Sequence, residues 1–314
     1  MNLTKIGLLT LSKVFKPEIV KATLALTWRC NHKCASCLIW CNNTVKNELT
    51  TDEVQKFIEN NNLMWLAFTG GEAFLRKDIA EIMHMSLQKY PSVSITSNGS
   101  QPEKIEKSVK YALKNTQGIL TVNMSLDGNQ EQHDSFTRVQ GSFERVTESF
   151  DRLIALKNKR LSLVIDNLVS PITDAGREFV LRYAEEKDLK VVYTIEMRSD
   201  AFYHNNEMPV PEIKLPETKL DLRNPFNYLY IRQAKRGKKV RCVAGQYDCA
   251  ITPEGKVKPC LFVDKVAYNL RDTNYKIKPL ECNKTVEKCY QNGSCWTPCT
   301  AYTTMMFRLN RIIF

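Results

Sequence analysis

Short apolar segments alternate with longer amphipathic ones between residues 22 and 196. The apolar segments are rich in β-branched residues and end at polar turns, which predicts strands at 22–27, 64–69, 92–97, 119–126, 161–169 and 190–196. Between them, residues 104–115 and 143–158 place apolar side chains at helical spacing. Thr50 and Glu53 form a capping-box sequence that predicts a helix running to Asn60.

These alternating elements predict an α/β fold, a partial (β/α)6 TIM-like barrel with a parallel sheet inside and helices outside. In such a barrel the functional residues lie on the loops that follow the strands. The chemically distinctive segments fall there: cysteines follow the first strand, residues 70–72 follow the second, and residues 97–99 end the third. Their position therefore supports the fold prediction.

The pattern divides the chain into four regions. An N-terminal extension is expected at 1–20 and the barrel core at 21–200. Residues 201–240 are polar and contain Pro209, Pro211, Pro216 and Pro225, which is typical of a connecting region. Residues 241–314 are rich in cysteines and turn residues, and we expect a small C-terminal domain there.

The composition excludes some classes of protein. The 314 residues are 43% apolar and 25% charged, as in an ordinary folded domain. The sequence contains no run of 18 apolar residues and no secretory signal, so a cytoplasmic protein is expected. The net charge of +11 comes without a continuous basic tract and interleaved aromatic residues, which argues against nucleic acid as a partner.

The eleven cysteines are clustered. Four lie between Cys30 and Cys41, seven lie between Cys242 and Cys299, and the 200 residues between contain none. In a long chain without a signal peptide, this distribution indicates two metal-binding regions rather than disulfides.

Cys30, Cys34 and Cys37 form a Cys-x3-Cys-x2-Cys motif. Three thiolates on one loop can hold three irons of a 4Fe–4S cluster and leave the fourth iron open to a small chelating molecule. Cys41 could instead close the cluster as a fourth ligand, or the four thiols could bind zinc.

The series of motifs resembles that of the radical S-adenosylmethionine (SAM) superfamily, which has this cysteine motif after its first strand. The further matches are Gly70-Gly71-Glu72, Ser97-Asn98-Gly99, Ser125-Leu126-Asp127-Gly128, His133-Asp134 and Arg138. Two positions depart from the family: Ser36 stands where an aromatic residue is usual, and Ala73 where proline is usual.

This resemblance implies a cofactor site. SAM is expected to chelate the open iron of a 4Fe–4S cluster, with its methionine amine near the backbone of Gly70 and Gly71 and the charge of Glu72. The resemblance further assigns Ser97 and Asn98 to the ribose or carboxylate of SAM, and Ser125 and Arg138 to its carboxylate. Reduction would split SAM into methionine and a 5′-deoxyadenosyl radical that takes hydrogen from a substrate. His32 is expected to face solvent rather than to bind metal.

The second cysteine region resembles the auxiliary-cluster extensions called SPASM and twitch. Residues 250–260 look like the β-hairpin of that extension, with Gly255 in the turn. The region lacks the Cys-x2-Cys pair and the late cysteine of a full SPASM domain, which favours one auxiliary 4Fe–4S cluster over two. Its expected ligands are Cys242, Cys260 and Cys299 with either Cys249 or Cys295, and structural zinc is the alternative.

We therefore expect a radical SAM enzyme that abstracts hydrogen, possibly from a peptide or protein. Radical modification of a membrane lipid or small molecule is the alternative, and a non-catalytic iron–sulfur electron carrier or sensor is the alternative from another class. An electron donor such as ferredoxin or flavodoxin is the implied partner. The segment before the first strand is too short for a separate leader-peptide-binding domain, which weakens the case for leader-peptide substrates.

Both ends of the sequence, residues 3–16 and 305–314, combine apolar and basic side chains. A basic amphipathic helix can lie on an anionic membrane, so peripheral membrane contact is one hypothesis. Packing of both ends on the barrel is the other.

Overall fold

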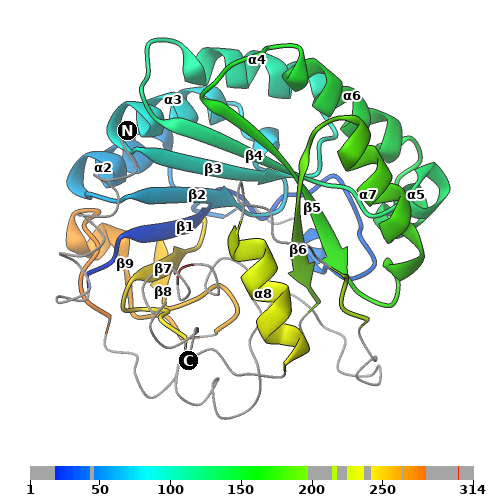
Figure 1. Ribbon diagram of the computed structural model, residues 1–314. Helices are drawn as coiled ribbons and strands as arrows, with labels where there is room; N and C mark the ends of the chain where they lie inside the picture. The colour runs from blue at the N-terminus through cyan, green and yellow to red at the C-terminus, as the bar shows by residue number, and fades with distance from the viewer. Residues whose placement is uncertain are drawn as a thin grey trace.

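A computed structural model describes residues 18–42, 46–196, 214–217, 225–236, 242–263, 265–280 and 303. Within these ranges one sheet has the strand order β6-β5-β4-β3-β2-β1-β7-β8-β9 (Figure 1). The strands are β1 Lys21–Ala25, β2 Trp65–Thr69, β3 Ser92–Ser97, β4 Ile119–Ser125, β5 Leu161–Val169, β6 Lys190–Ile195, β7 Asp248–Ile251, β8 Lys256–Lys258 and β9 Tyr268–Asn269. The helices are α2 Thr51–Asn60, α3 Ile79–Lys89, α4 Pro102–Leu113, α5 Gln130–Thr137, α6 Ser142–Ile154, α7 Arg177–Glu186 and α8 Pro225–Lys235.

The first six strands run parallel, and each connection between them carries a helix. In the described part of the chain β6 pairs with β5 and β1 pairs with β2 and β7, so the barrel is open rather than closed. The fold is therefore the predicted α/β partial barrel.

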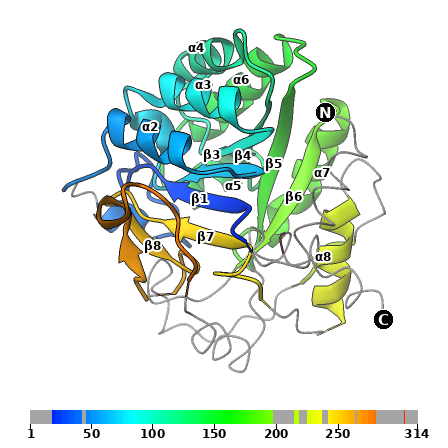
Figure 2. The same cartoon turned by 90° about the vertical axis from the view of Figure 1, so that its left-hand side faces the viewer.

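The two faces of this sheet differ in chemistry. Leu24, Phe68, Ile95 and Val122 are register neighbours on β1 to β4, and each is 1% exposed or less. They belong to the main apolar core, under the helices seen on one side of the sheet in Figure 2. The adjacent row, Thr23, Ala67, Ser94 and Thr121, faces the other way, because side chains alternate along a strand. The inner face is therefore lined by small and polar side chains.

The strand predictions are confirmed to within two residues at each end. The capping box is confirmed as well: Thr50 Oγ1 accepts a bond from the Glu53 N–H (3.2 Å), and Glu53 Oε2 accepts one from the Thr50 N–H (2.9 Å). Helix α4 begins two residues earlier than expected, because Pro102 occupies its first turn, where a missing N–H costs nothing.

Helix α8 lies inside the expected connecting region. Tyr230 and Ile231 of α8 pack against Val169, Tyr193 and Ile195, and the Ile195 N–H donates to the Tyr230 hydroxyl (3.3 Å). The helix therefore covers β5 and β6 as part of the barrel. Because of its prolines, the segment 201–240 was predicted to be a connecting region without a helix. Pro225 is nevertheless the first residue of α8, a position that proline favours.

The C-terminal hairpin continues the barrel sheet. Strand β7 pairs in parallel with β1, and β7 and β8 form an antiparallel hairpin with Gly255 at φ +80°. The expected hairpin is thus present, although the domain boundaries themselves stay predictions. Cys282, Cys289, Cys295 and Cys299 lie outside the described residues, as do the amphipathic segments 3–16 and 305–314. No helix in the described ranges is long and apolar enough to cross a membrane.

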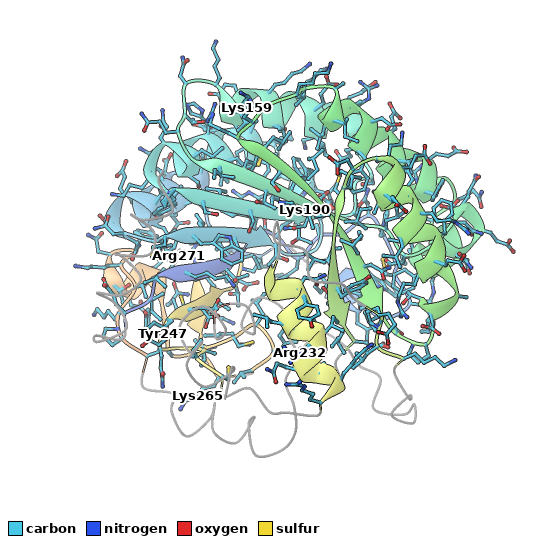
Figure 3. The ribbon with its side chains drawn as sticks, in the orientation of Figure 1. Lys159, Lys190, Arg232, Tyr247, Lys265 and Arg271 are labelled. Atoms are coloured by element: carbon cyan, nitrogen blue, oxygen red, sulfur yellow. The ribbon has the colours of Figure 1, made fainter. Side chains whose placement is uncertain are left out.

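One ion-pair network fastens the segment after the hairpin to α2. Arg271 is labelled in Figure 3. Its guanidinium donates to both carboxylate oxygens of Glu53 (2.6 and 2.9 Å) and to the carbonyl oxygens of Glu254 and Asn47. The Tyr275 hydroxyl adds a bond to Glu53 (2.8 Å). Mainly because of the Arg271 bond, the pKa of Glu53 falls to about 2.

Replacement of Arg271 with methionine should lower the free energy of unfolding at pH 7 by about 2 kcal/mol, the scale of a charge-assisted pair with further hydrogen bonds. Glu53 has a lowered pKa in the folded chain and a pKa of about 4.3 in the unfolded chain. Its pairing with Arg271 therefore stabilises the fold above about pH 5, and this contribution is lost as the pH falls toward 2. Denaturant unfolding between pH 7 and pH 3 should show the difference between wild type and variant shrinking.

Arg182→Met is the matched control, because the exposed Arg182–Glu178 pair should contribute little. A wild-type advantage over Arg271→Met that is the same at pH 7 and pH 3 would contradict the assigned role of Glu53.

Candidate active site

The candidate residues gather at the carboxyl edge of the parallel sheet. The cysteine loop, residues 26–42, follows β1, and residues 70–72 follow β2. Ser97 ends β3 and Ser125 ends β4. Parallel neighbours end at one edge, so the fold brings together motifs that are far apart in the sequence.

The cysteine loop is fastened to the end of α5. The Lys33 and Ala35 N–H groups donate to the carbonyl oxygens of Thr137 (3.1 Å) and Phe136 (2.9 Å). His32 is 1% exposed, so the expectation that it faces solvent is wrong. Burial lowers the pKa of His32 to about 4, and the charge of Arg145 acts in the same direction. His32, which lies between Cys30 and Cys34 in the sequence, is therefore a buried, neutral imidazole.

The three thiols of the motif are only partly exposed, whereas Cys41 is exposed. The pKa of Cys30 is raised to about 11, mainly by burial and in part by the charges of Glu72 and Cys37. Burial likewise raises the pKa values of Cys34 and Cys37. Binding of a metal displaces the protons of cysteine thiols, so these three residues can serve as cluster ligands. In the described ranges, no three His, Cys, Asp or Glu side chains form a site for a single metal ion.

Gly70 and Gly71 lie against the start of the cysteine loop. A Cβ atom on Gly71 would stand 2.1 Å from the Arg29 carbonyl oxygen, and one on Gly70 would stand 2.3 Å from that of Thr27. The Gly71 and Glu72 N–H groups donate to these same two oxygens, Thr27 and Arg29 respectively, each at 2.7 Å. Glycine is thus required here for contact between two loops, a reason that the sequence did not reveal.

Glu72 connects the loops after β2 and β3. Its side chain is 1% exposed, and its Oε1 accepts bonds from the Phe74 N–H (2.9 Å) and the Ser97 hydroxyl (3.0 Å). Its Oε2 accepts a bond from the Asn98 N–H (2.7 Å). Burial raises the pKa of Glu72, while these donors oppose the shift. The carboxylate therefore holds the end of β3 in place.

Asn31 is a site residue that sequence reasoning missed. Its Oδ1 accepts a bond from Asn98 Nδ2 (2.8 Å), and its Nδ2 donates to the Ser100 hydroxyl (2.8 Å). Asn31 thus joins the cysteine loop to the loop after β3. Its place inside the cysteine motif was the available signal, but only the fold shows which strand end it meets.

Ser125 and Arg138 lie on either side of α5 in the sequence. Ser125 is half-buried and is the register neighbour of Asp166 on β5, whose Oδ1 accepts a bond from the Thr194 hydroxyl (2.6 Å). Burial raises the pKa of Asp166. This carboxylate is a second polar group that the sequence did not single out, on the inner face at the edge where the motifs end.

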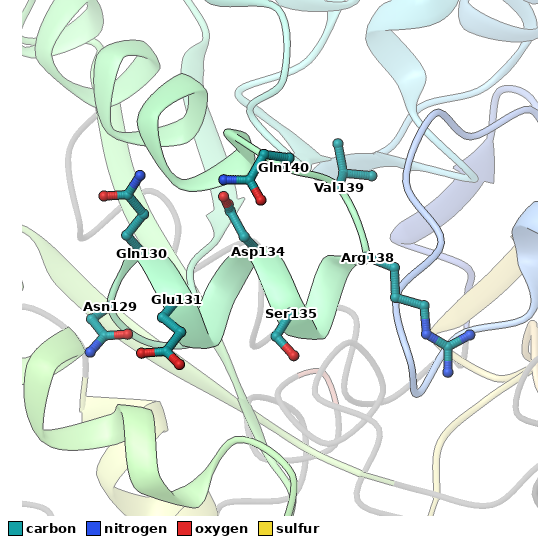
Figure 4. Close-up of a pocket in the computed structure, with 8 residues that line it drawn as sticks. All are labelled: Asn129, Gln130, Glu131, Asp134, Ser135, Arg138, Val139 and Gln140. Carbon is teal, nitrogen blue, oxygen red and sulfur yellow. The ribbon is translucent and has the colours of Figure 1, made fainter.

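Arg138 ends α5 in the left-handed conformation (φ +55°) and is exposed. Figure 4 shows it beyond the last turn of α5, beside a pocket of about 780 Å³ that Glu131, Ser135 and Gln140 also line. Asp134 accepts bonds from the Gly141 N–H (2.6 Å) and the Phe143 N–H (2.8 Å), so it fixes the start of α6. Asp134, one of the residues that match the family motifs, therefore has a structural role. Arg138, another of these residues, forms no ion pair within the described ranges.

In the second cysteine region, Cys242 and Cys260 share a local geometry with Cys30. The N–H two residues further on approaches the sulfur in each case, at 3.4 Å from Ala244, 3.4 Å from Phe262 and 3.5 Å from His32. Cys249 lies on β7 and is part of the apolar core. Hydrogen bonds to sulfur are typical of cluster ligands, so Cys242 and Cys260 have the suitable geometry.

Several known proteins resemble this chain. A sequence model described as the radical SAM superfamily matches residues 24–184. The subtilosin biosynthesis protein AlbA of Bacillus subtilis is 26% identical over 79% of this chain and 56% of its own length. Fe-coproporphyrin III synthase of Methanosarcina barkeri is 33% identical over 43% of this chain and 33% of its own. The chain therefore spans about half or less of the length of these curated relatives.

Among solved structures, Streptococcus suis SuiB bound to its precursor peptide SuiA has the same fold. Its TM-score is 0.59 at 15% identity, with 87% of this chain and 68% of that chain covered.

Proposed function

This chain belongs to the radical SAM superfamily, and we propose that it is an enzyme that reductively cleaves SAM and abstracts hydrogen from a substrate. The observation that carries the proposal is the cysteine loop, where three partly buried thiols lie beside the ends of β2, β3 and β4. A 4Fe–4S cluster bound there would supply the electron that splits SAM into methionine and a 5′-deoxyadenosyl radical. A cluster that must be reduced also favours the cytoplasm as its compartment.

In this proposal Cys30, Cys34 and Cys37 hold three irons, and SAM binds beside them. The exposed Arg138 guanidinium and the Ser125 hydroxyl are free to bind the carboxylate of SAM. Gly70 and Gly71 keep the loop after β2 against the cysteine loop and leave the approach to the methionine amine clear. Glu72 fixes Ser97 and Asn98 at the end of β3, where Asn98 can reach the ribose or carboxylate.

The decisive experiment is an anaerobic turnover assay. Protein reconstituted with iron and sulfide and reduced with dithionite should convert SAM into equal amounts of 5′-deoxyadenosine and methionine, measured by chromatography and mass spectrometry. S-adenosylhomocysteine has no sulfonium to cleave and should give no product. Bound iron without any deoxyadenosine would contradict the enzyme and favour the electron carrier or sensor.

For the substrate, we propose a peptide or protein. AlbA is named for the biosynthesis of a bacteriocin, and SuiB was solved with its precursor peptide. The polar inner face of the sheet, with Asp166 and Thr194 at its carboxyl edge, suits the many donors and acceptors of a peptide backbone.

We further propose one auxiliary 4Fe–4S cluster held by Cys242, Cys260, Cys299 and either Cys249 or Cys295. The N–H groups directed at Cys242 and Cys260 support the first two ligands. The core position of Cys249 makes Cys295 the better fourth ligand. An auxiliary cluster can accept the electron that remains when a substrate radical is oxidised.

A further inference from the structure

A closed ring of hydrogen bonds joins the cysteine loop to the loop after β3. Asn98 Nδ2 donates to Asn31 Oδ1 (2.8 Å), and Asn31 Nδ2 donates to the Ser100 hydroxyl (2.8 Å). The Ser100 N–H donates in turn to Asn98 Oδ1 (3.0 Å). We call Asn31, Asn98 and Ser100 the amide ring. Because Asn31 directly follows Cys30, the ring lies next to a candidate cluster ligand along the chain.

The ring fixes the direction in which each of its two side-chain amides points. A backbone N–H can only donate, so the group of Asn98 that meets Ser100 is its carbonyl oxygen. The NH2 group of Asn98 then faces Asn31, whose carbonyl oxygen accepts the bond. The NH2 group of Asn31 is left for the Ser100 hydroxyl. The direction of every bond in the ring therefore follows from one backbone N–H.

Asn98 is held at its backbone as well as at its side chain. Glu72 Oε2 accepts a bond from the Asn98 N–H (2.7 Å), and Glu72 Oε1 accepts one from the Ser97 hydroxyl (3.0 Å). One N–H of the Asn98 side chain is bonded to Asn31, so within the described contacts its NH2 group has one N–H left. This N–H is the donor with which Asn98 can bind an oxygen atom of a ligand.

Stability does not explain the ring. Asn31 is exposed and Asn98 is half-buried, and a hydrogen bond that water can replace adds little to the free energy of unfolding. The same bonds remove the rotamer freedom of both amides before a ligand arrives, and such pre-organisation favours binding. The ring is therefore better suited to orienting Asn98 for a ligand than to stabilising the fold.

We propose that Asn31 is a positioning residue for SAM, which holds the Asn98 amide so that its remaining N–H binds an oxygen atom of the cofactor. This inference rests on the proposed function, which assigns Asn98 to the ribose or carboxylate of SAM. Asn31 acts through Asn98 and not by contact with SAM. The residue that follows the first candidate cluster ligand thus contributes to the affinity for SAM without being a ligand itself.

The test measures SAM affinity by anaerobic equilibrium dialysis, in the full chain carrying its clusters. Asn31→Ala opens the ring and should weaken SAM binding about tenfold, the scale of one oriented hydrogen bond. Ser100→Ala leaves the bond between Asn31 and Asn98 in place, so it should weaken binding less. The matched control is Gln117→Ala, which removes an exposed amide ahead of β4, at the opposite edge of the sheet. It should stay within about twofold of wild type.

A double-mutant cycle separates positioning from damage to the cysteine loop. If Asn31 acts through Asn98, Asn31→Ala should have no further effect on SAM affinity in an Asn98→Ala background. Iron content per chain, and the thermal unfolding of the metal-free protein, should match wild type in Asn31→Ala, because Asn31 is exposed.

Unchanged SAM affinity in Asn31→Ala, an equal loss in Gln117→Ala, or the same loss with and without Asn98 would overturn the positioning role. Loss of iron from Asn31→Ala would likewise overturn it and assign Asn31 to the cysteine loop alone. Wild type and variants that show the expected affinities while no protein forms deoxyadenosine would refute the proposed function and leave the positioning role standing.

Discussion

Alanine at Cys30, Cys34 or Cys37 should abolish SAM cleavage, whereas Cys41→Ala should retain it. The three thiols lie together on a loop fastened to α5, and loss of one would leave the cluster with two protein ligands. Cys41 is exposed in the short helix Ile39–Asn42, and a fourth thiolate would occupy the iron that SAM needs. The assay is 5′-deoxyadenosine formation by reconstituted, dithionite-reduced protein. The Cys30→Ala, Cys34→Ala and Cys37→Ala variants are each expected to lose at least about a hundredfold.

The Cys41→Ala variant is the matched control, since it removes a thiol from the same loop. Full activity in Cys30→Ala together with a loss in Cys41→Ala would refute the ligand assignment. The triple variant of the first motif should keep about four irons per chain if the C-terminal cysteines hold one auxiliary cluster. Stoichiometric zinc without residual iron would assign that region to a structural zinc site.

The barrel was predictable because its signals are local. A strand such as residues 92–97 shows directly in the sequence that Val93 and Ile95 alternate with polar residues. The Thr50–Glu53 capping box likewise lies within four residues. Helix α8 was missed because its apolar contacts, such as that of Tyr230 with Ile195, are formed with a strand about 35 residues earlier. Propensity and spacing do not report contacts of this kind.

The motifs lie at the ends of neighbouring strands, but the sequence alone does not show which contacts each of their side chains makes. Gly71 and Glu72 were assigned to the cofactor, and that assignment stays a prediction. The structure adds that Gly71 lies against the backbone of Arg29 and that Glu72 accepts bonds from Ser97 and Asn98. His32 was expected to face solvent, but its side chain is buried. Such roles depend on which loops meet at the carboxyl edge, and that is decided by the sheet order rather than by the motif itself.

Glu72→Ala should consequently destabilise the fold itself, by roughly 3 kcal/mol even in the absence of SAM and iron. The change leaves the buried Phe74 N–H and the partly buried Asn98 N–H without their acceptor. Glu72→Gln should cost less, because its amide oxygen can still accept bonds from Phe74 and Ser97 while its NH2 group opposes the Asn98 N–H. Thermal unfolding of the metal-free protein measures both effects, and SAM affinity should fall in parallel as Ser97 and Asn98 shift. Glu103→Ala, at a carboxylate whose side chain is 76% exposed, is the control and should unfold like wild type. If Glu72→Ala unfolds at the wild-type temperature and loses SAM binding alone, Glu72 acts on the cofactor and not on the loops.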